Sequence, residues 1–277
     1  MCVILVRYCE IGLKSTPVRR RFENILRENM LSMLAADGVE ALVTFADARF
    51  YVETSDVEGC VASVRKVFGI ASLSVTKECS SDMEEICAKI ADYSERRIDR
   101  EESFAVKVKR EGTHPYTSMD LGREAGSAVF TRNEDKKVRV DLTNPDKIFY
   151  IEVRNNKAYI FDSYVHCPGG LPLGSQGRVM AEVHDKRGAV SAWMMMKRGC
   201  RVLIKGDYGW DVLSRYDPNL RAVKDEDDYI GIVKGTSLEQ LKDIDLSGFD
   251  LPVYFPTIGM DDAEVDVLFE SMEKSEF

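Results

Sequence analysis

Residues 3–8 are VILVRY, a short run of apolar and mostly β-branched side chains that predicts a buried strand. Residues 16–17, Thr-Pro, follow as a typical helix start, with proline at the first helical position. Two strands around a turn, a second helix and a strand over 71–75 complete the series. The order strand–helix–strand–strand–helix–strand predicts a ferredoxin-like α+β unit over residues 1–75.

A second unit alternates helix and strand patterns again. It has predicted helices over 82–97 and 118–130, an alternating strand over 104–110 (FAVKVKR), and three further strands over 138–142, 148–153 and 157–161. The helix over 118–130 is indicated by Met119, among other apolar positions. The stretch 163–177 is rich in glycine and proline and indicates a boundary loop.

Beyond this loop the pattern changes to that of a parallel sheet. It predicts a strand over 178–183, a helix around 188–198 and a strand over 201–204, with two short apolar strands further on. A strand–helix–strand succession joins parallel strands. We therefore interpret residues 166–277 as an α/β domain.

The composition excludes several classes of protein. The 277 residues are 44% hydrophobic and 9% aromatic, which supports packed domains and excludes long disorder. No apolar run approaches about 18 residues, so we expect no transmembrane helix, and the opening MCVILVRYCE lacks the features of a signal peptide. The seven scattered cysteines favour a reducing cytoplasm over a disulfide framework or a zinc ribbon.

The net charge of −9 is unevenly distributed. Residues 225–277 carry fifteen acidic and three basic residues, a local charge of −12, which leaves the preceding chain at +3. A mildly basic body is compatible with nucleic-acid binding. Ordinary charge scatter explains the same numbers equally well.

The residues indicate no catalytic or metal site. The three histidines stand at no spacing typical of paired metal ligands, and no nucleotide-binding glycine motif or G-x-S-x-G occurs. Basic side chains instead form three groups, at 14–21, 107–110 and 136–139. Lys107 and Lys109 share one face of a strand, where they are placed either to follow phosphates or to form a solvated face.

Several stretches together carry a resemblance to a known family. They are VILVRYCEIGLKS at the start, FAVKVKREGTHPYTSMDLGREAGSAVF in the middle, and GGLPLGSQGRVM followed by AVSAWMMMKRG. They resemble the tRNA 4-thiouridine sulfurtransferase (ThiI) family. The resemblance implies a ferredoxin-like domain over 1–75, a THUMP domain over 76–165, and a degenerate, truncated ATP pyrophosphatase (PP-loop) domain over 166–277.

A THUMP domain implies binding of the 3′ acceptor end of tRNA. Such binding needs basic groups for phosphates and polar or aromatic groups for unstacked bases. The resemblance assigns this role to Lys107, Lys109, Arg110, His114, Tyr116, Ser118, Arg123, Asn144 and Arg154. For Tyr116, packing within a loop is an equal alternative. For Arg123 and Arg154 the alternative is a surface ion pair.

The nucleotide loop departs from the family pattern. Active members have S-G-G-x-D-S, a loop whose backbone N–H groups hold the phosphates of ATP. The matching nucleotide-binding positions here are Val183, His184, Asp185, Lys186, Arg187 and Gly188, with Gly235 in the later motif KGTSLEQ. Both glycines are replaced, and a carboxylate repels phosphate. The family's catalytic cysteine has no counterpart before Gly235.

We therefore expect a cytoplasmic tRNA-binding protein without membrane association, catalytic residues, metal, cofactor or ATP pyrophosphatase activity. Two alternatives stay open. The first is an active ATP-dependent tRNA sulfurtransferase that uses a rebuilt loop around Lys186, Arg187 and Gly188. The second is a structural role, in a homodimer or beside an active sulfurtransferase partner, through the acidic region 225–277.

Overall fold

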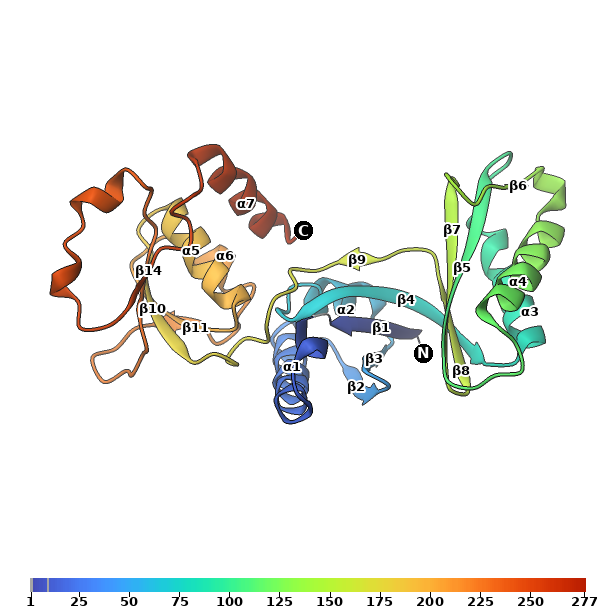
Figure 1. Ribbon diagram of the computed structural model, residues 1–277, viewed down its shortest axis with the longest axis horizontal. Helices are drawn as coiled ribbons and strands as arrows, with labels where there is room; N and C mark the ends of the chain where they lie inside the picture. Colours follow the sequence, from blue (N-terminus) through green and yellow to red (C-terminus); the bar gives the residue numbers. More distant parts are fainter. Residues whose placement is uncertain (1, 9) are drawn as a thin grey trace.

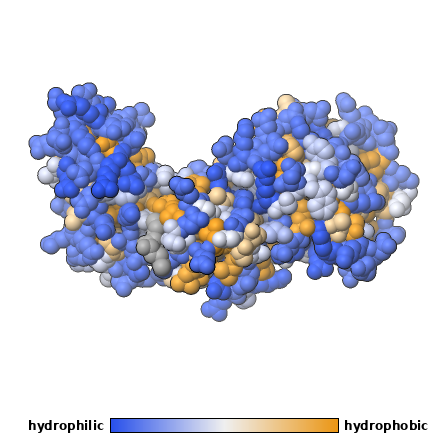
Figure 2. Space-filling model, turned by 180° about the vertical axis from the view of Figure 1, so that it is seen from behind, coloured by the Kyte–Doolittle hydropathy of each residue, from blue (hydrophilic) through white to orange (hydrophobic). Residues whose placement is uncertain are grey.

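The computed structural model describes residues 2–8 and 10–277. Figure 1 shows three lobes in a row, with the N-terminal domain (β1 to the first part of β4) in the middle. The second domain (the last part of β4 to β8) lies at one end, and the C-terminal domain (β10 to α7) lies at the other. From behind, the end lobes rise on either side of a broad hollow (Figure 2).

The N-terminal domain has the predicted ferredoxin-like order. Its elements are β1 (Cys2–Tyr8), η1 (Glu10–Leu13), α1 (Thr16–Ala36), β2 (Ala41–Ala46), β3 (Arg49–Thr54), α2 (Val57–Val64) and β4 (Ile70–Ser80). The strands form an antiparallel sheet in the order β2-β3-β1-β4, whose core includes Leu26 and Val52. Helix α1 begins where the sequence predicts, with Pro17 in its first turn and Ser15 as N-cap.

The second domain packs two helices against a mixed sheet. Its elements are α3 (Met83–Glu95), β5 (Ser103–Glu111), α4 (Ser118–Arg132), η2 (Glu134–Lys136), β6 (Arg139–Val140), β7 (Lys147–Arg154) and β8 (Lys157–Phe161). The strand predicted over 138–142 is only two residues long. The side chain of Asp141 accepts the backbone N–H groups of Thr143 and Asn144, and this turn takes the chain out of the sheet.

Strand β4 belongs to both of these domains. Its first part pairs with β1, up to Thr76, and its last part pairs with β8 from Lys77 onward. The two sheets therefore join into one nine-stranded sheet. The ninth strand of this sheet, β9 (Val165–His166), pairs with β4. The prediction of a strand over 71–75 was too short, because the pairing with β8 involves residues far along the chain.

The C-terminal domain contains the predicted parallel sheet, in the order β12-β11-β10-β13-β14. Its elements are β10 (Arg178–Glu182), α5 (Lys186–Lys197), β11 (Arg201–Lys205), α6 (Trp210–Leu213), β12 (Arg221–Ala222), β13 (Ile232–Lys234), η3 (Gln240–Asp243), η4 (Leu246–Gly248), β14 (Val253–Tyr254) and α7 (Asp262–Lys274). Helix α7, which was not predicted, packs on α5 and begins with a capping box formed by Asp261 and Glu264.

An aromatic side chain of the N-terminal domain enters the core of the C-terminal domain. Phe68 lies edge-on to Trp193 at 5.4 Å between ring centroids and stacks on Tyr216 at 5.5 Å. The connecting loop makes close backbone contact with α5 at Gly170, where a Cβ atom would come within 2.2 Å of the carbonyl oxygen of Lys197. Within residues 2–8 and 10–277, no helix is both long and apolar enough to cross a membrane.

Candidate functional site

The predicted RNA-facing residues lie on two faces of the second domain. Side chains along β5 alternate between the two faces of the sheet. Val106 and Val108 face α4, whereas Lys107 and Lys109 are exposed on the opposite face. Lys109 stands beside Glu152 of β7 on this helix-free face. The structure therefore separates the lysine pair from the predicted residues on α4.

A groove runs between α4 and β5, with a cavity volume of about 560 Å³. Its apolar lining includes Val106, Val108 and Phe130, and Gly122 and Gly126 of α4 leave room above the strand. The short β6 leaves the edge of β5 without a strand partner after Phe104 on this side. We call this feature the α4–β5 groove.

Several polar and apolar side chains at the rim of the α4–β5 groove are exposed to solvent. Met119, one of the apolar positions by which the sequence predicts this helix, is 79% exposed. Leu142 is also exposed. Ser118 and Arg123 line the same rim, and the Arg123 side chain is 67% exposed although it pairs with Asp120 at 3.0 Å. Such an exposed ion pair is weak and leaves the guanidinium available to a ligand.

The turn after β5 is ordered by contacts within the protein. The Nε2 atom of His114 lies 2.6 Å from the carbonyl oxygen of Asn155, to which it donates its proton. The Nδ1 atom then accepts from Arg110 Nη1, which lies 3.2 Å away and also donates to the carbonyl oxygen of Gly112. Arg110 and His114 are thus pre-positioned at one end of the sheet.

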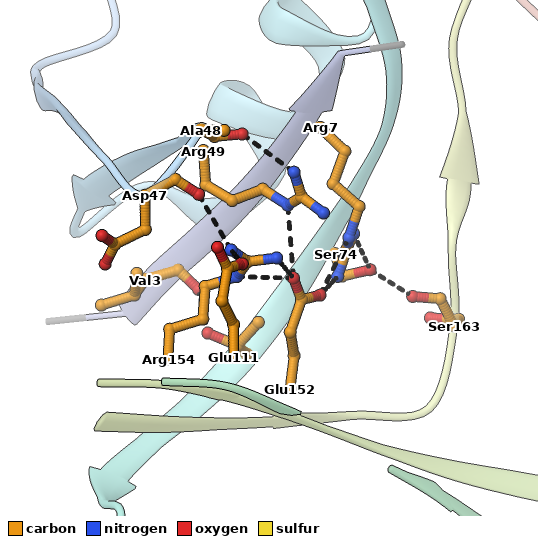
Figure 3. Close-up of polar contacts among 11 residues, drawn as sticks. Val3, Arg7, Asp47, Ala48, Arg49, Ser74, Glu111, Glu152, Arg154 and Ser163 are labelled. Carbon is orange, nitrogen blue, oxygen red and sulfur yellow. Dashed lines mark hydrogen bonds and ion pairs between the residues drawn. The ribbon is translucent and has the colours of Figure 1, made fainter. Parts of the chain in front are cut away.

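Two predicted residues are buried, and we leave them out of the interface. Tyr116 packs in the core of the second domain and donates its hydroxyl proton to the carbonyl oxygen of Ser81. Burial raises the pKa of its phenol. Arg154 is buried in ion pairs with Glu152 and Glu111 (Figure 3). Packing, the alternative for Tyr116, is what the structure shows, whereas the ion pairs of Arg154 are buried and not the surface pair that was the alternative for it. Asn144 is exposed in the turn after β6.

A second cavity, of about 350 Å³, lies at the start of α5, and its lining includes four of the predicted nucleotide-binding residues, His184, Asp185, Gly188 and Gly235. His184 and Asp185 are exposed beside it, and the Asp185 side chain accepts the backbone N–H of Gly188 at 2.7 Å. This carboxylate is the N-cap of α5. Gly235 contacts the loop closely, because a Cβ atom there would lie 2.3 Å from the backbone nitrogen of Gly188.

The basic groups of the loop point away from this cavity. Lys186 pairs with Asp266 of α7. Arg187 is buried, and its Nη1 donates to the carbonyl oxygens of Thr257 (3.0 Å) and Met260 (2.9 Å). Its Nη2 donates to Asp262 at 2.7 Å. Both side chains therefore attach α7 to the start of α5.

The remaining cation at the cavity, Lys234, is paired with Glu182. Burial by itself raises the pKa of the Glu182 carboxyl, but Lys234 and Lys205 outweigh this effect and hold it below its usual range. Asp243 adds a further acidic group to the lining. Among the residues that the structure describes, no group of three or more candidate ligands suits a metal ion.

Comparison with known proteins identifies these domains. The N-terminal domain matches the family model of the ThiI ferredoxin-like domain over residues 3–74, and the second domain matches that of the THUMP domain over residues 80–161. The "Probable tRNA sulfurtransferase" of Methanocaldococcus jannaschii is 36% identical over 261 residues, which cover 85% of this chain and 68% of the relative. The chain belongs to the tRNA sulfurtransferase family.

Other members of the family are longer than this chain. The "Probable tRNA sulfurtransferase" of Methanosarcina acetivorans is 38% identical over 204 residues, 72% of this chain and 49% of the relative. The chain thus spans about half the length of the first relatives it matches.

Solved structures share the whole fold. The crystal structure of PH1313 from Pyrococcus horikoshii matches with a TM-score of 0.83 at 26% identity, over 99% of this chain and 100% of that one. A 4-thiouridine synthetase–RNA complex with bound ATP matches with a TM-score of 0.77 at 22% identity, over 99% and 86%. The three-domain architecture, with the parallel C-terminal sheet, is therefore shared with both of these solved structures.

Contacts within the protein occupy several groups of the loop that could otherwise bind the phosphates of ATP, the nucleotide that the family pattern implies. The backbone N–H of Gly188 is already bonded to the carboxylate of Asp185 at the helix N-terminus, where a phosphate would bind. Lys186 and Arg187 are held by α7, and Lys234 is neutralised by Glu182. The cavity therefore presents the carboxylates of Glu182, Asp185 and Asp243 to a triphosphate, while the basic side chains nearby are paired.

Proposed function

We propose that this chain binds tRNA through the THUMP domain, with the single-stranded 3′ end in the α4–β5 groove. The observation that carries the proposal is the groove itself, an accessible apolar channel with Ser118 and Arg123 on its rim. Unstacked bases bind to apolar surfaces, while cationic groups bind the phosphates between them. The matches to the THUMP model and to the tRNA sulfurtransferases support RNA as the ligand.

The lysine pair extends this interface to the other face of the sheet. Lys107 and Lys109 are exposed on that face. They bind phosphates of the double-stranded part next to the 3′ end, where base sequence is not read. Arg110 and His114 lie on the turn that follows β5, at the end of the same strand.

The proposed role is binding without ATP pyrophosphatase chemistry. The internal carboxylate at Asp185 and the paired cations around the cavity support this part of the proposal. Calorimetric titration with ATP tests it, and we expect a dissociation constant above about 1 mM. A micromolar constant would instead favour the active sulfurtransferase.

Filter binding tests the RNA interface. We expect Arg123→Ala to weaken binding of intact tRNA by about fivefold, the loss of one exposed charge-assisted contact. The same substitution should not affect a tRNA that lacks its single-stranded 3′ end. Arg132→Ala, which removes an exposed arginine of the same helix outside the groove, is the matched control. Equal losses for both RNAs, or for both variants, would remove the groove from the interface.

A further inference from the structure

The N-terminal and THUMP domains have separate cores but share one strand. The cluster around Leu26 and Val52 belongs to the first core, and that around Leu121 and Ile151 belongs to the second. Strand β4 passes from one sheet to the other between Thr76 and Lys77. Because strands twist and bend readily, a shared strand alone does not fix the angle between two domains.

A buried carboxylate lies beside this junction. Glu152 of β7 is 2% exposed and contacts arginines from three strands. Its Oε2 accepts from Arg7 Nε (3.1 Å) and Nη2 (3.0 Å) of β1, and its Oε1 accepts from Arg49 Nε (3.2 Å) of β3 and Arg154 Nε (2.8 Å) of β7. Figure 3 shows the three guanidinium groups converging on this one side chain from both domains.

The surrounding groups hold Arg7 in a single position. Its guanidinium lies 4.8 Å from the ring centroid of Phe161 and 4.7 Å from that of Tyr164. Nη1 donates to the Ser74 hydroxyl at 3.0 Å, and that hydroxyl donates to the carbonyl oxygen of Ser163 at 2.8 Å. Arg7 is therefore bound to the second sheet by stacking as well as by charge.

A second contact fixes the β2–β3 turn against the THUMP domain. Arg154 Nη1 donates to the backbone carbonyl of Asp47 at 2.8 Å, and Asn155 Nδ2 donates to the Asp47 carboxylate at 2.7 Å. The same hairpin carries Phe45 and Ala48, which line a cavity of about 410 Å³ with arginines of α1. Movement of the hairpin would thus change the shape of the cavity that it forms with these arginines.

The electrostatics make Glu152 indispensable to this cluster. Within the described part of the chain, it is the acidic partner of both Arg7 and Arg49, and Arg154 has Glu111 in addition. Burial by itself raises the pKa of the Glu152 carboxyl, but Arg7, Arg154 and Arg49 together hold it below its usual range. Removing one member of a buried ion pair leaves its partners uncompensated.

We propose that Glu152 is a positioning residue for RNA binding, which fixes the angle between the N-terminal and THUMP domains by joining Arg7 and Arg49 to Arg154. This inference rests on the proposed function. A tRNA that meets the arginines of α1 and the THUMP groove at once binds tightly only when their separation matches the RNA. Loss of the fixed angle then lowers the effective concentration of the second surface.

The test compares Glu152→Gln with the wild type in the full chain. Residual dipolar couplings report whether the two domains share one alignment frame, and filter binding gives affinities for tRNA and for a short RNA of the 3′-end sequence. We expect two separate frames in the variant, a loss of about tenfold for tRNA and an unchanged affinity for the short RNA. Glu78→Gln, which alters an ion pair with Lys157 beside the same junction, is the matched control and should retain one frame.

The following outcomes would contradict the proposal. One shared frame with wild-type tRNA affinity, or equal losses for both RNAs, overturns it. If Glu152→Gln does not fold, Arg49→Gln takes its place. The Arg49 side chain is 21% exposed, so its replacement should destabilise the protein less than replacement of the buried Glu152. We then expect a loss of about threefold for tRNA alone, and an unchanged tRNA affinity overturns the proposal. A wild-type chain that binds neither RNA contradicts the proposed function, while the alignment frames still test Glu152.

Discussion

Helices α4 and α5 begin in similar ways, but they differ in whether the basic side chains near their N-termini are exposed to solvent. Both follow a strand of their sheet, and both are capped by a side chain that accepts a backbone N–H group, Thr117 in α4 and Asp185 in α5. Around α4 the rim arginine stays exposed above an apolar groove. Around α5 both basic residues of the first turn are tied to other parts of the fold.

The difference shows that basic residues indicate a ligand site only when the fold leaves their charged groups exposed to solvent. Arg187 and Arg123 each occur near the start of a helix, yet Arg187 is buried against carbonyl oxygens and Arg123 faces solvent. A buried guanidinium that satisfies its donors internally stabilises the fold and is unavailable to phosphate. The predictions that follow separate these two roles.

The largest effect is expected at Arg187. Replacement by alanine removes the guanidinium donor from the carbonyl oxygens of Thr257 and Met260, of which Thr257 keeps the backbone N–H of Met260, and it detaches Asp262 from α5. We expect the free energy of unfolding of the C-terminal domain to fall by about 2 kcal/mol, measured by urea denaturation. Affinity for tRNA should stay at the wild-type value, which is the opposite of what a phosphate-binding arginine would give. Lys186→Ala, with an exposed ion pair, is the control and should unfold at nearly the wild-type urea concentration.

The second effect concerns the exposed lysines of β5. Lys107→Ala with Lys109→Ala removes two cations from the helix-free face without disturbing the core. We expect tRNA affinity to fall by about tenfold, and the slope of log K against log salt to flatten by about two units, because each phosphate contact releases close to one counterion. Filter binding over a salt series measures both quantities. An unchanged slope would mean that these lysines form only a solvated face.

The order of the elements could be predicted because it depends on local patterns. VILVRY, the alternation in FAVKVKR and the helix over 118–130 each mark their element within a few residues. Contacts between distant residues were not predictable in this way. The last part of β4 pairs with β8, and Arg154 is buried only because Glu152, Glu111 and the turn at Asp47 surround it.

The site was predicted only in part for the same reason. A periodic pattern identifies the lysine face of β5, but it does not distinguish the exposed Met119 from a core residue. Helix α7 was missed, although its capping box at Asp261 and Glu264 was a usable signal. That helix also determines where Lys186 and Arg187 point, so the pairing of these two side chains depends on a segment about 80 residues later in the chain.

A smaller effect is expected from filling the α4–β5 groove. A Cβ atom at Gly126 would meet no other heavy atom within 4 Å, so Gly126→Leu places a side chain in the groove without a clash. Leucine also favours a helix over glycine by roughly 0.5–1 kcal/mol. We therefore expect an equal or higher melting temperature together with about a threefold loss of affinity for tRNA with an intact 3′ end. Glu124→Leu, on the same helix outside the groove, should leave binding unchanged, and a Gly126→Leu protein with full affinity would place the 3′ end elsewhere.

The smallest effect, effectively none, is expected at the cysteine of the C-terminal domain. Cys200 is buried beside β11, and burial raises the pKa of its thiol, so the reactive thiolate is scarce at neutral pH. In the native protein at pH 8, iodoacetamide should leave Cys200 unmodified, as it should Cys60, whose pKa burial raises to about 11. Peptide mass spectrometry measures this, with urea-unfolded protein as the positive control for alkylation. Rapid modification of Cys200 but not Cys60 in the folded chain would reveal an activated thiol in the C-terminal domain. It would then reverse the comparison, because the reactive group would lie in the C-terminal domain, beside a loop whose basic side chains are paired.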